Sequence, residues 1–169
     1  FRDCYAVGGI DLSQTTDLTA ASVVIQKDGT LYAFTQFFMP RGRLEYLQAT
    51  DGVPYDIFVK KGLITLSGEN YVDYHDVYGW FTMLLEDYGI RPLKIGYDRY
   101  SAQYLITDMA NYGFHMDDVY QGENLTPVIR EFEGIIKDGD FKIADNNLLF
   151  QLTTSRRGRR LMKMALCGA

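Results

Sequence analysis

Two aspartates of this sequence stand near the ends of apolar, strand-like runs, where a carboxylate can bind a divalent cation. Asp11 lies at the end of the run of residues 5–12, and Asp98 directly follows the run of residues 93–97. An acid in such a place is costly unless a partner compensates its charge, and carboxylate oxygens suit Mg²⁺ and Mn²⁺. If the two strands are adjacent and parallel, a shared ion relieves the repulsion between the carboxylates. The alternative for Asp11 is a structural aspartate that caps the next turn.

Two further aspartates are weaker candidates for the same metal site. Asp17 lies in a polar segment shortly after Asp11, and it joins the site if that segment folds back. Asp145 follows a brief strand that we predict at residues 142–144. For both residues an aspartate that stabilises a polar turn is the competing interpretation.

Other catalytic arrangements lack support in the sequence. His75 and His115 have no neighbouring serine or cysteine pattern, and there is no nucleophile-elbow motif or glycine-rich phosphate loop. Cys4 and Cys167 are not spaced as a Cys-x-x-Cys pair, and two histidines cannot complete a zinc site with them. Carboxylate-bound metal chemistry is therefore the leading hypothesis.

The elements that must position these acids read as a mixed α/β domain. Residues 5–12, 20–26 and 31–39 predict three successive strands, with Asp28-Gly29 as a hairpin turn. Residues 43–68 predict a partly helical excursion that packs on the sheet. Apolar spacing predicts helices over residues 73–88, 101–112 and 126–136, the last with Thr126 as its cap and Pro127 at its first position. This order indicates a mixed sheet with helices on its faces, in a single domain over residues 1–169.

Composition and charge narrow the classes of function. Of the 169 residues, 47% are hydrophobic and 23% are charged, which is typical of a globular domain. No window is apolar for long enough to cross a membrane, and with no secretory signal at the start we expect a reduced, intracellular setting. The net charge of −5 argues against nucleic-acid binding by bulk charge. A local basic cluster stands near the end of the chain, for which a solvated tail is the alternative: Arg156, Arg157, Arg159, Arg160 and Lys163.

The ordered series of short motifs resembles the nuclease domain of tailed-bacteriophage terminase large subunits. The resemblance runs through roughly residues 5–150, and the order and spacing of the pieces make it specific. The motifs that carry it are Gly9-Ile10-Asp11-Leu12-Ser13, Thr16-Asp17-Leu18-Thr19-Ala20, Gly52-Val53-Pro54-Tyr55, residues 62–66 with Gly68, Tyr71-Val72-Asp73-Tyr74, Ile95-Gly96-Tyr97-Asp98-Arg99-Tyr100 with Ala102, Gln121-Gly122, Leu125-Thr126-Pro127 and Asp145-Asn146-Asn147-Leu148-Leu149.

The resemblance implies a ribonuclease H-like fold and two-metal cleavage of double-stranded DNA with Mg²⁺ or Mn²⁺. Asp11 would be the central metal-bridging acid and Asp98 the acid of the middle strand, while Asp17 matches an acidic position near the site. Arg99 and the basic cluster at residues 156–163 are candidates for phosphate contacts, with little reading of bases.

The resemblance also implies a setting and partners. The domain would cut concatemeric viral DNA in the cytoplasm of the host cell, together with a packaging ATPase domain, a small terminase subunit and a portal, and with no membrane partner. No segment of this chain resembles the packaging ATPase, so we expect the nuclease domain alone.

One departure from the family leaves alternatives open. The family tends to place a further acid near the start of its final helix, whereas residues 160–169 contain none. Asp145 could substitute for that acid. With the acidic net charge, this departure favours a second hypothesis: a catalytically weak module that docks on DNA or on a portal. A third hypothesis is another ribonuclease H-like nuclease, of the resolvase or transposase type.

Overall fold

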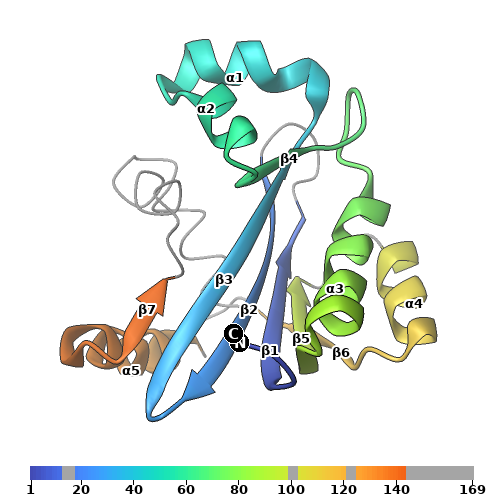
Figure 1. Cartoon of the computed structure of the whole chain (residues 1–169). Helices are drawn as coiled ribbons and strands as arrows, with labels where there is room; N and C mark the ends of the chain where they lie inside the picture. Colours follow the sequence, from blue (N-terminus) through green and yellow to red (C-terminus); the bar gives the residue numbers. More distant parts are fainter. Residues whose placement is uncertain (13–17, 99–102, 121–124, 144–169) are drawn as a thin grey trace.

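The fold is built on one mixed β-sheet in the computed structural model of the chain (Figure 1). The structure describes residues 1–12, 18–98, 103–120 and 125–143. The strand order is β4-β3-β2-β1-β5-β6, and β7 pairs with β3 beside this path. In chain order the strands are β1 (Tyr5–Asp11), β2 (Thr19–Lys27), β3 (Thr30–Met39), β4 (Ile64–Leu66), β5 (Arg91–Asp98), β6 (Met116–Val119) and β7 (Phe141–Ile143).

The first three strands form an antiparallel meander, as the sequence predicts. The β2–β3 hairpin closes through Asp28-Gly29, with Lys27 paired to Thr30. Both turn residues have positive φ, 51° at Asp28 and 82° at Gly29, which is the backbone that a two-residue hairpin loop requires. Because β2 runs antiparallel to both neighbours and β5 runs parallel to β1, β1, β3 and β5 all point the same way.

The helices lie in three places around the sheet. After the 3-10 turn η1 (Arg41–Arg43), α1 (Leu44–Asp51) and α2 (Tyr55–Lys60) form a cap at one end, at the top of Figure 1. The pair α3 (Tyr74–Tyr88) and α4 (Gln103–Tyr112) lies along the sheet on one side, to the right in Figure 1. The amphipathic α5 (Leu125–Asp138) lies beside β7 at the lower left, where Phe132 contacts Phe141 with ring centroids 4.8 Å apart.

Two hydrophobic clusters hold these layers together. The larger one joins α3 and α4 to the sheet through residues such as Ile10, Phe81 and Ile95. The smaller one lies beneath α1 and α2, where Phe37 and Phe58 are almost fully buried. The excursion predicted at residues 43–68 therefore packs on the sheet as expected.

Helix ends follow the local signals in the sequence. Asp73 caps α3, and Gly89 ends it in the left-handed conformation at φ 66°, where glycine carries no steric penalty. The prediction for α5 needs a correction, because the helix begins at Leu125 and Thr126 is therefore already inside its first turn. The strands β4 and β6, of three and four residues, are absent from the sequence-based prediction.

Candidate active site

Asp11 and Asp98 end two neighbouring parallel strands at the same level of the sheet. Strands β1 and β5 are in register through Gly9–Gly96 and Ile10–Tyr97, so the two aspartates follow next on each strand. Paired residues of adjacent strands project to the same face. The topology therefore brings together the two carboxylates that the sequence singles out.

The strand alternation determines which face these carboxylates share. Ile10 packs in the cluster under α3 and α4, so its neighbour Asp11 points to the opposite face. There Asp11 is paired with Ala20 of β2, a member of the cluster beneath α1 and α2. This apolar border leaves Asp11 only 8% exposed.

Burial changes the acidity of Asp11. Desolvation raises the pKa of its carboxyl from 3.8 to about 6, and the negative charge of Asp98 adds to the rise. Both causes act against the ionised form. A divalent cation between these oxygens would remove the repulsion and compensate the desolvated charge, so the donor set fits a hard cation such as Mg²⁺ or Mn²⁺.

Gly8 permits the close approach of β1 to the core. A Cβ at Gly8 would stand 2.9 Å from Cγ1 of Ile95 and 3.2 Å from Cε1 of Phe81. The space that this glycine leaves is therefore filled by the core rather than offered to a substrate. On the face of the sheet that carries Asp11 and Asp98, the residues two positions earlier on each strand are Gly9 and Gly96, which pair with each other. Strands β1 and β5 therefore place no side chain there.

The remaining predicted site residues lie outside the described part of the chain. These are Asp17, Asp145, Arg99, Arg156, Arg157, Arg159, Arg160 and Lys163. Within the described ranges, no group of three or more His, Cys, Asp or Glu residues is arranged to hold a metal ion. The described site is therefore a pair of carboxylates.

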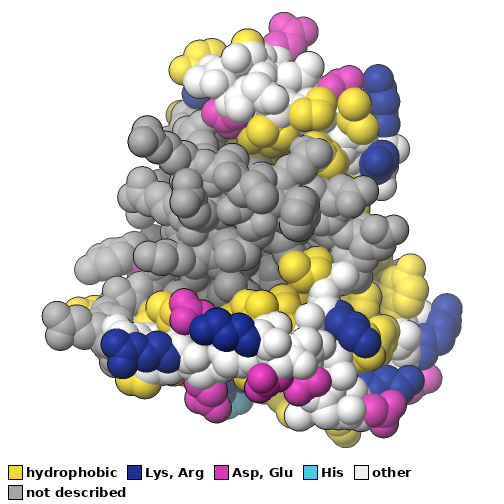
Figure 2. Space-filling view, turned by 90° about the vertical axis from the view of Figure 1, so that its left-hand side faces the viewer, with side chains coloured by type: hydrophobic (Ala, Val, Ile, Leu, Met, Phe, Trp, Pro, Cys, Tyr) yellow, Lys and Arg dark blue, Asp and Glu magenta, His cyan; other side chains and the backbone are white. Residues whose placement is uncertain are grey.

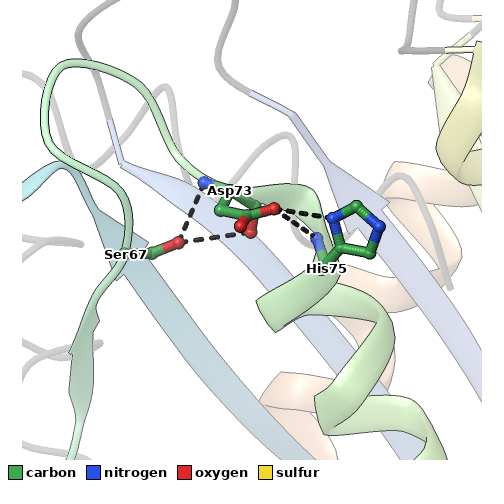
Figure 3. Close-up of polar contacts among 3 residues, drawn as sticks. All are labelled: Ser67, Asp73 and His75. Atoms are coloured by element: carbon green, nitrogen blue, oxygen red, sulfur yellow. Dashed lines mark hydrogen bonds and ion pairs between the residues drawn. The ribbon is translucent and has the colours of Figure 1, made fainter.

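Ser67, Asp73 and His75 are residue types found in hydrolytic triads, but their geometry is that of a helix cap (Figure 3). The Ser67 hydroxyl accepts the backbone N–H of Asp73 at 2.9 Å and donates to its carbonyl at 3.2 Å. The Asp73 carboxylate accepts the backbone N–H of His75 at 3.0 Å and contacts its Nδ1 at 2.9 Å. Because the serine contacts the aspartate backbone rather than the imidazole, nothing here activates it as a nucleophile.

Sequence reasoning missed two polar features of the described residues. Lys94 forms an ion pair with Asp117 at 2.9 Å across β5 and β6. The sequence does not predict this pair, because β6 is too short to show the alternation of apolar and polar residues that marks a strand. Tyrosines of α3 and α4 line a cavity, which the abundance of tyrosine in the sequence does not by itself predict. The available signal was their spacing along each helix, four residues between Tyr74 and Tyr78 and eight between Tyr104 and Tyr112.

The fold and the strand-end acids define the class of protein. The chain aligns with the crystal structure of the HK97 bacteriophage large terminase with a TM-score of 0.81 and 23% identity, over 98% of this chain and 40% of that one. This match confirms the expected ribonuclease H-like α/β fold, a mixed sheet flanked by helices.

Sequence comparison gives the family. The profile of the family described as terminase large subunit, endonuclease domain, matches residues 2–159, so the chain belongs to this family of bacteriophage nuclease domains. It is 31% identical over 143 residues to the terminase large subunit of Lactococcus phage p2, covering 83% of this chain and 26% of that protein. It is 28% identical to the large subunit of Enterobacteria phage HK97, over 82% of this chain and 27% of that protein. The chain thus spans about a quarter of the length of these relatives.

Among the described helices, none is long and apolar enough to cross a membrane.

Proposed function

We propose that this chain is a metal-dependent endonuclease domain that cleaves double-stranded DNA. The observation that carries the proposal is the pair of carboxylates at adjacent strand ends, in which buried Asp11 stands beside Asp98 and its pKa is raised to about 6. A cation stabilises the ionised form of a carboxylate that is buried beside a second carboxylate. Membership of the terminase nuclease family supports DNA as the substrate.

Asp11 and Asp98 are the proposed core of the metal site. Magnesium sites commonly use one or two protein carboxylates and complete the coordination with water and substrate phosphate, so this pair suffices to hold the first ion. A second ion needs further ligands, for which Asp17 and Asp145 are the candidates in the sequence. Bound ions of this kind activate water and stabilise the leaving oxygen of a phosphodiester.

The protein's own contribution is to position these ligands and the DNA. Asp11, held by the register of β1 against β2 and β5, is the proposed bridging ligand, and Asp98 approaches from the neighbouring strand. Arg99 and the basic residues at 156–163 are the proposed phosphate contacts, which would bind DNA with little dependence on base sequence.

The proposed setting is viral genome packaging in the host cytoplasm. The domain would cut concatemeric DNA as part of a larger terminase, with a packaging ATPase domain, a small terminase subunit and a portal as partners. This proposal follows from the family and from relatives of which this chain matches only about a quarter of the length.

A docking module that binds DNA or a portal without cutting is the second candidate. Two features of the sequence favour it: residues 160–169 contain no acid where the family tends to place one, and the net charge is −5. On the side shown in Figure 2, the described Lys and Arg side chains lie among Asp and Glu instead of forming one basic field.

The deciding experiment measures Mn²⁺-dependent cleavage of a supercoiled plasmid by the whole chain and by its Asp11→Asn variant. We expect the substitution to lower the cleavage rate by about a thousandfold, because several kcal/mol of metal-mediated stabilisation is lost. Asp73→Asn is the matched control, since asparagine also caps helices, and it should cleave like the wild type. Equal cleavage by wild type and Asp11→Asn would refute the assignment of Asp11. No cleavage and no Mn²⁺ binding at millimolar concentration would favour the docking module.

A further inference from the structure

A cavity of about 380 Å³ lies between α3 and α4, on the side of the sheet opposite the carboxylate pair. Half of its lining residues are tyrosines: Tyr74 and Tyr78 of α3, and Tyr104 and Tyr112 of α4. Residues four or eight apart lie on the same side of a helix, so each helix turns an aromatic row toward the other. The volume is near the lower end for ligand sites, and it suits a side chain rather than a whole helix.

The tyrosines meet in two pairs across the helix interface. Tyr74 stacks on Tyr104 with centroids 5.8 Å apart and planes at 25°. Tyr78 meets Tyr112 edge-on, with centroids 5.7 Å apart and planes at 88°. Asp108 lies midway between Tyr104 and Tyr112 along α4 and also lines the cavity. The cavity thus combines aromatic faces with a carboxylate.

The two helices that form the cavity carry more acidic than basic side chains. Neither α3 nor α4 contains a lysine or arginine, whereas the two helices carry four acids: Asp76, Glu86, Asp87 and Asp108. Asp73 adds a fifth acid at the cap of α3. The negative charges of Asp73 and Asp108 also raise the pKa of Tyr104, after desolvation as the main cause. These acids favour a cation near the rings, although His75 also lines the cavity and its Nδ1 lies 2.9 Å from the Asp73 carboxylate.

We propose that this cavity binds an arginine side chain presented by a protein partner. A guanidinium stacks on aromatic faces and donates paired hydrogen bonds to a carboxylate, and the cavity offers both kinds of surface. Lysine would gain the charge attraction but not the planar stacking. DNA is the wrong occupant, because the acids around the cavity repel phosphate. The cavity would dock a basic protein segment on the side of the sheet opposite the proposed DNA site, so this inference rests on the proposed function.

The test is an amide-resolved NMR titration of the whole chain with an acetylated and amidated Gly-Arg-Gly peptide. The same peptide with citrulline in place of arginine is the matched probe, since it retains the planar shape and loses the charge. We expect arginine-dependent shifts confined to residues 74–78 and 104–112, and at least about tenfold weaker binding of the citrulline peptide. Shifts elsewhere, or equal binding of both peptides, would overturn the proposal.

Two variants separate the cavity from general surface charge. Asp108→Asn should weaken arginine binding by about tenfold, because it removes the carboxylate of the cavity. Asp87→Asn removes an exposed acid of α3 that does not line the cavity, and it should bind like the wild type. Equal loss in both variants would reduce the effect to bulk charge and refute a defined site.

Two further arms test other occupants. Shifts at the same tyrosines on addition of an oligothymidylate would show a base-stacking surface and would overturn the proposal. Shifts that grow with protein concentration in the absence of peptide would identify a second copy of this chain as the occupant, and would also overturn it. The absence of both effects supports an arginine-bearing partner.

Discussion

Asp11 and Asp73 are the same residue type in opposite circumstances. Asp11 ends a strand and is 8% exposed, and burial raises its pKa to about 6. Asp73 begins a helix with a side chain that is 55% exposed. The backbone N–H and then the side chain of His75 lower the pKa of Asp73 by hydrogen bonding. One environment disfavours the carboxylate charge and the other favours it.

The difference separates a carboxylate that serves the fold from one that serves a ligand. At Asp73 the helix N-terminus supplies donors to the charge, as helix caps do. At Asp11 a pKa rise from 3.8 to about 6 corresponds to about 3 kcal/mol against the ionised form. A fold that maintains this cost at neutral pH holds a group prepared for a cation.

The largest effect on stability is expected from Asp11→Asn in the metal-free protein. Because its folded pKa is raised, the folded state binds the Asp11 proton more tightly than the unfolded state does. The stabilisation that this residue contributes is present below about pH 4 and is lost as the pH rises through about 6. At pH 7.5 we expect Asp11→Asn to raise the free energy of unfolding by about 2–3 kcal/mol.

Urea denaturation at pH 4 and at pH 7.5 measures this effect as the difference between wild type and variant. That difference should shrink toward pH 4. Asp73→Asn provides the comparison and should change stability little at pH 7.5, because asparagine retains the cap. A destabilised Asp11→Asn variant at pH 7.5 would mean that the Asp11 charge already has a partner within the protein.

The second largest effect is expected on metal binding, which should depend on Asp98 but not on Asp73. We expect Asp98→Asn to weaken Mn²⁺ binding by about a hundredfold, or about 2.7 kcal/mol, since it removes one of two charged ligands. Titration calorimetry at pH 7.5 measures the affinity. Asp73→Asn should leave it unchanged, and equal affinity in all three proteins would place the metal elsewhere.

Gly8→Ala tests whether the spacing of β1 and β5 matters to the carboxylate pair. Its Cβ would press on Ile95 and Phe81, and such overpacking costs about 1–3 kcal/mol. We expect lower stability in urea and weaker Mn²⁺ binding, because β5 must shift relative to β1. Gly79→Ala is the control, since a Cβ there meets nothing within 4 Å, and it should be neutral or slightly stabilising.

The smallest effect is expected from Asp73→Ala. Loss of an N-cap costs about 1 kcal/mol, so the midpoint of urea denaturation should fall while cleavage is retained. Because its folded pKa is lowered, the contribution of Asp73 is present above about pH 4 and is lost as the pH falls below that value. The loss of stability in Asp73→Ala should therefore become smaller in acid. The gain of stability in Asp11→Asn should also become smaller there, so the two changes have opposite signs but the same trend with pH.

Much of the fold was accessible from local patterns. The meander β1–β3, its Asp28-Gly29 turn and the helix α3 with its glycine stop carry strong signals in a few neighbouring residues. The strands β4 and β6 were missed because three or four residues show no measurable period, and their partners lie far along the chain. The tyrosine cavity was missed because its two walls come from different helices.

The sequence by itself determined that acids follow apolar strands at Asp11 and Asp98, and the ordered motifs around them indicated the family. Only the tertiary structure decided that these strands are parallel neighbours in register through Ile10 and Tyr97. It also decided that Asp11 is buried while Asp73 is not. The physical reason is that strand propensity and capping are local, whereas desolvation and charge repulsion depend on atoms that only the folded sheet brings together.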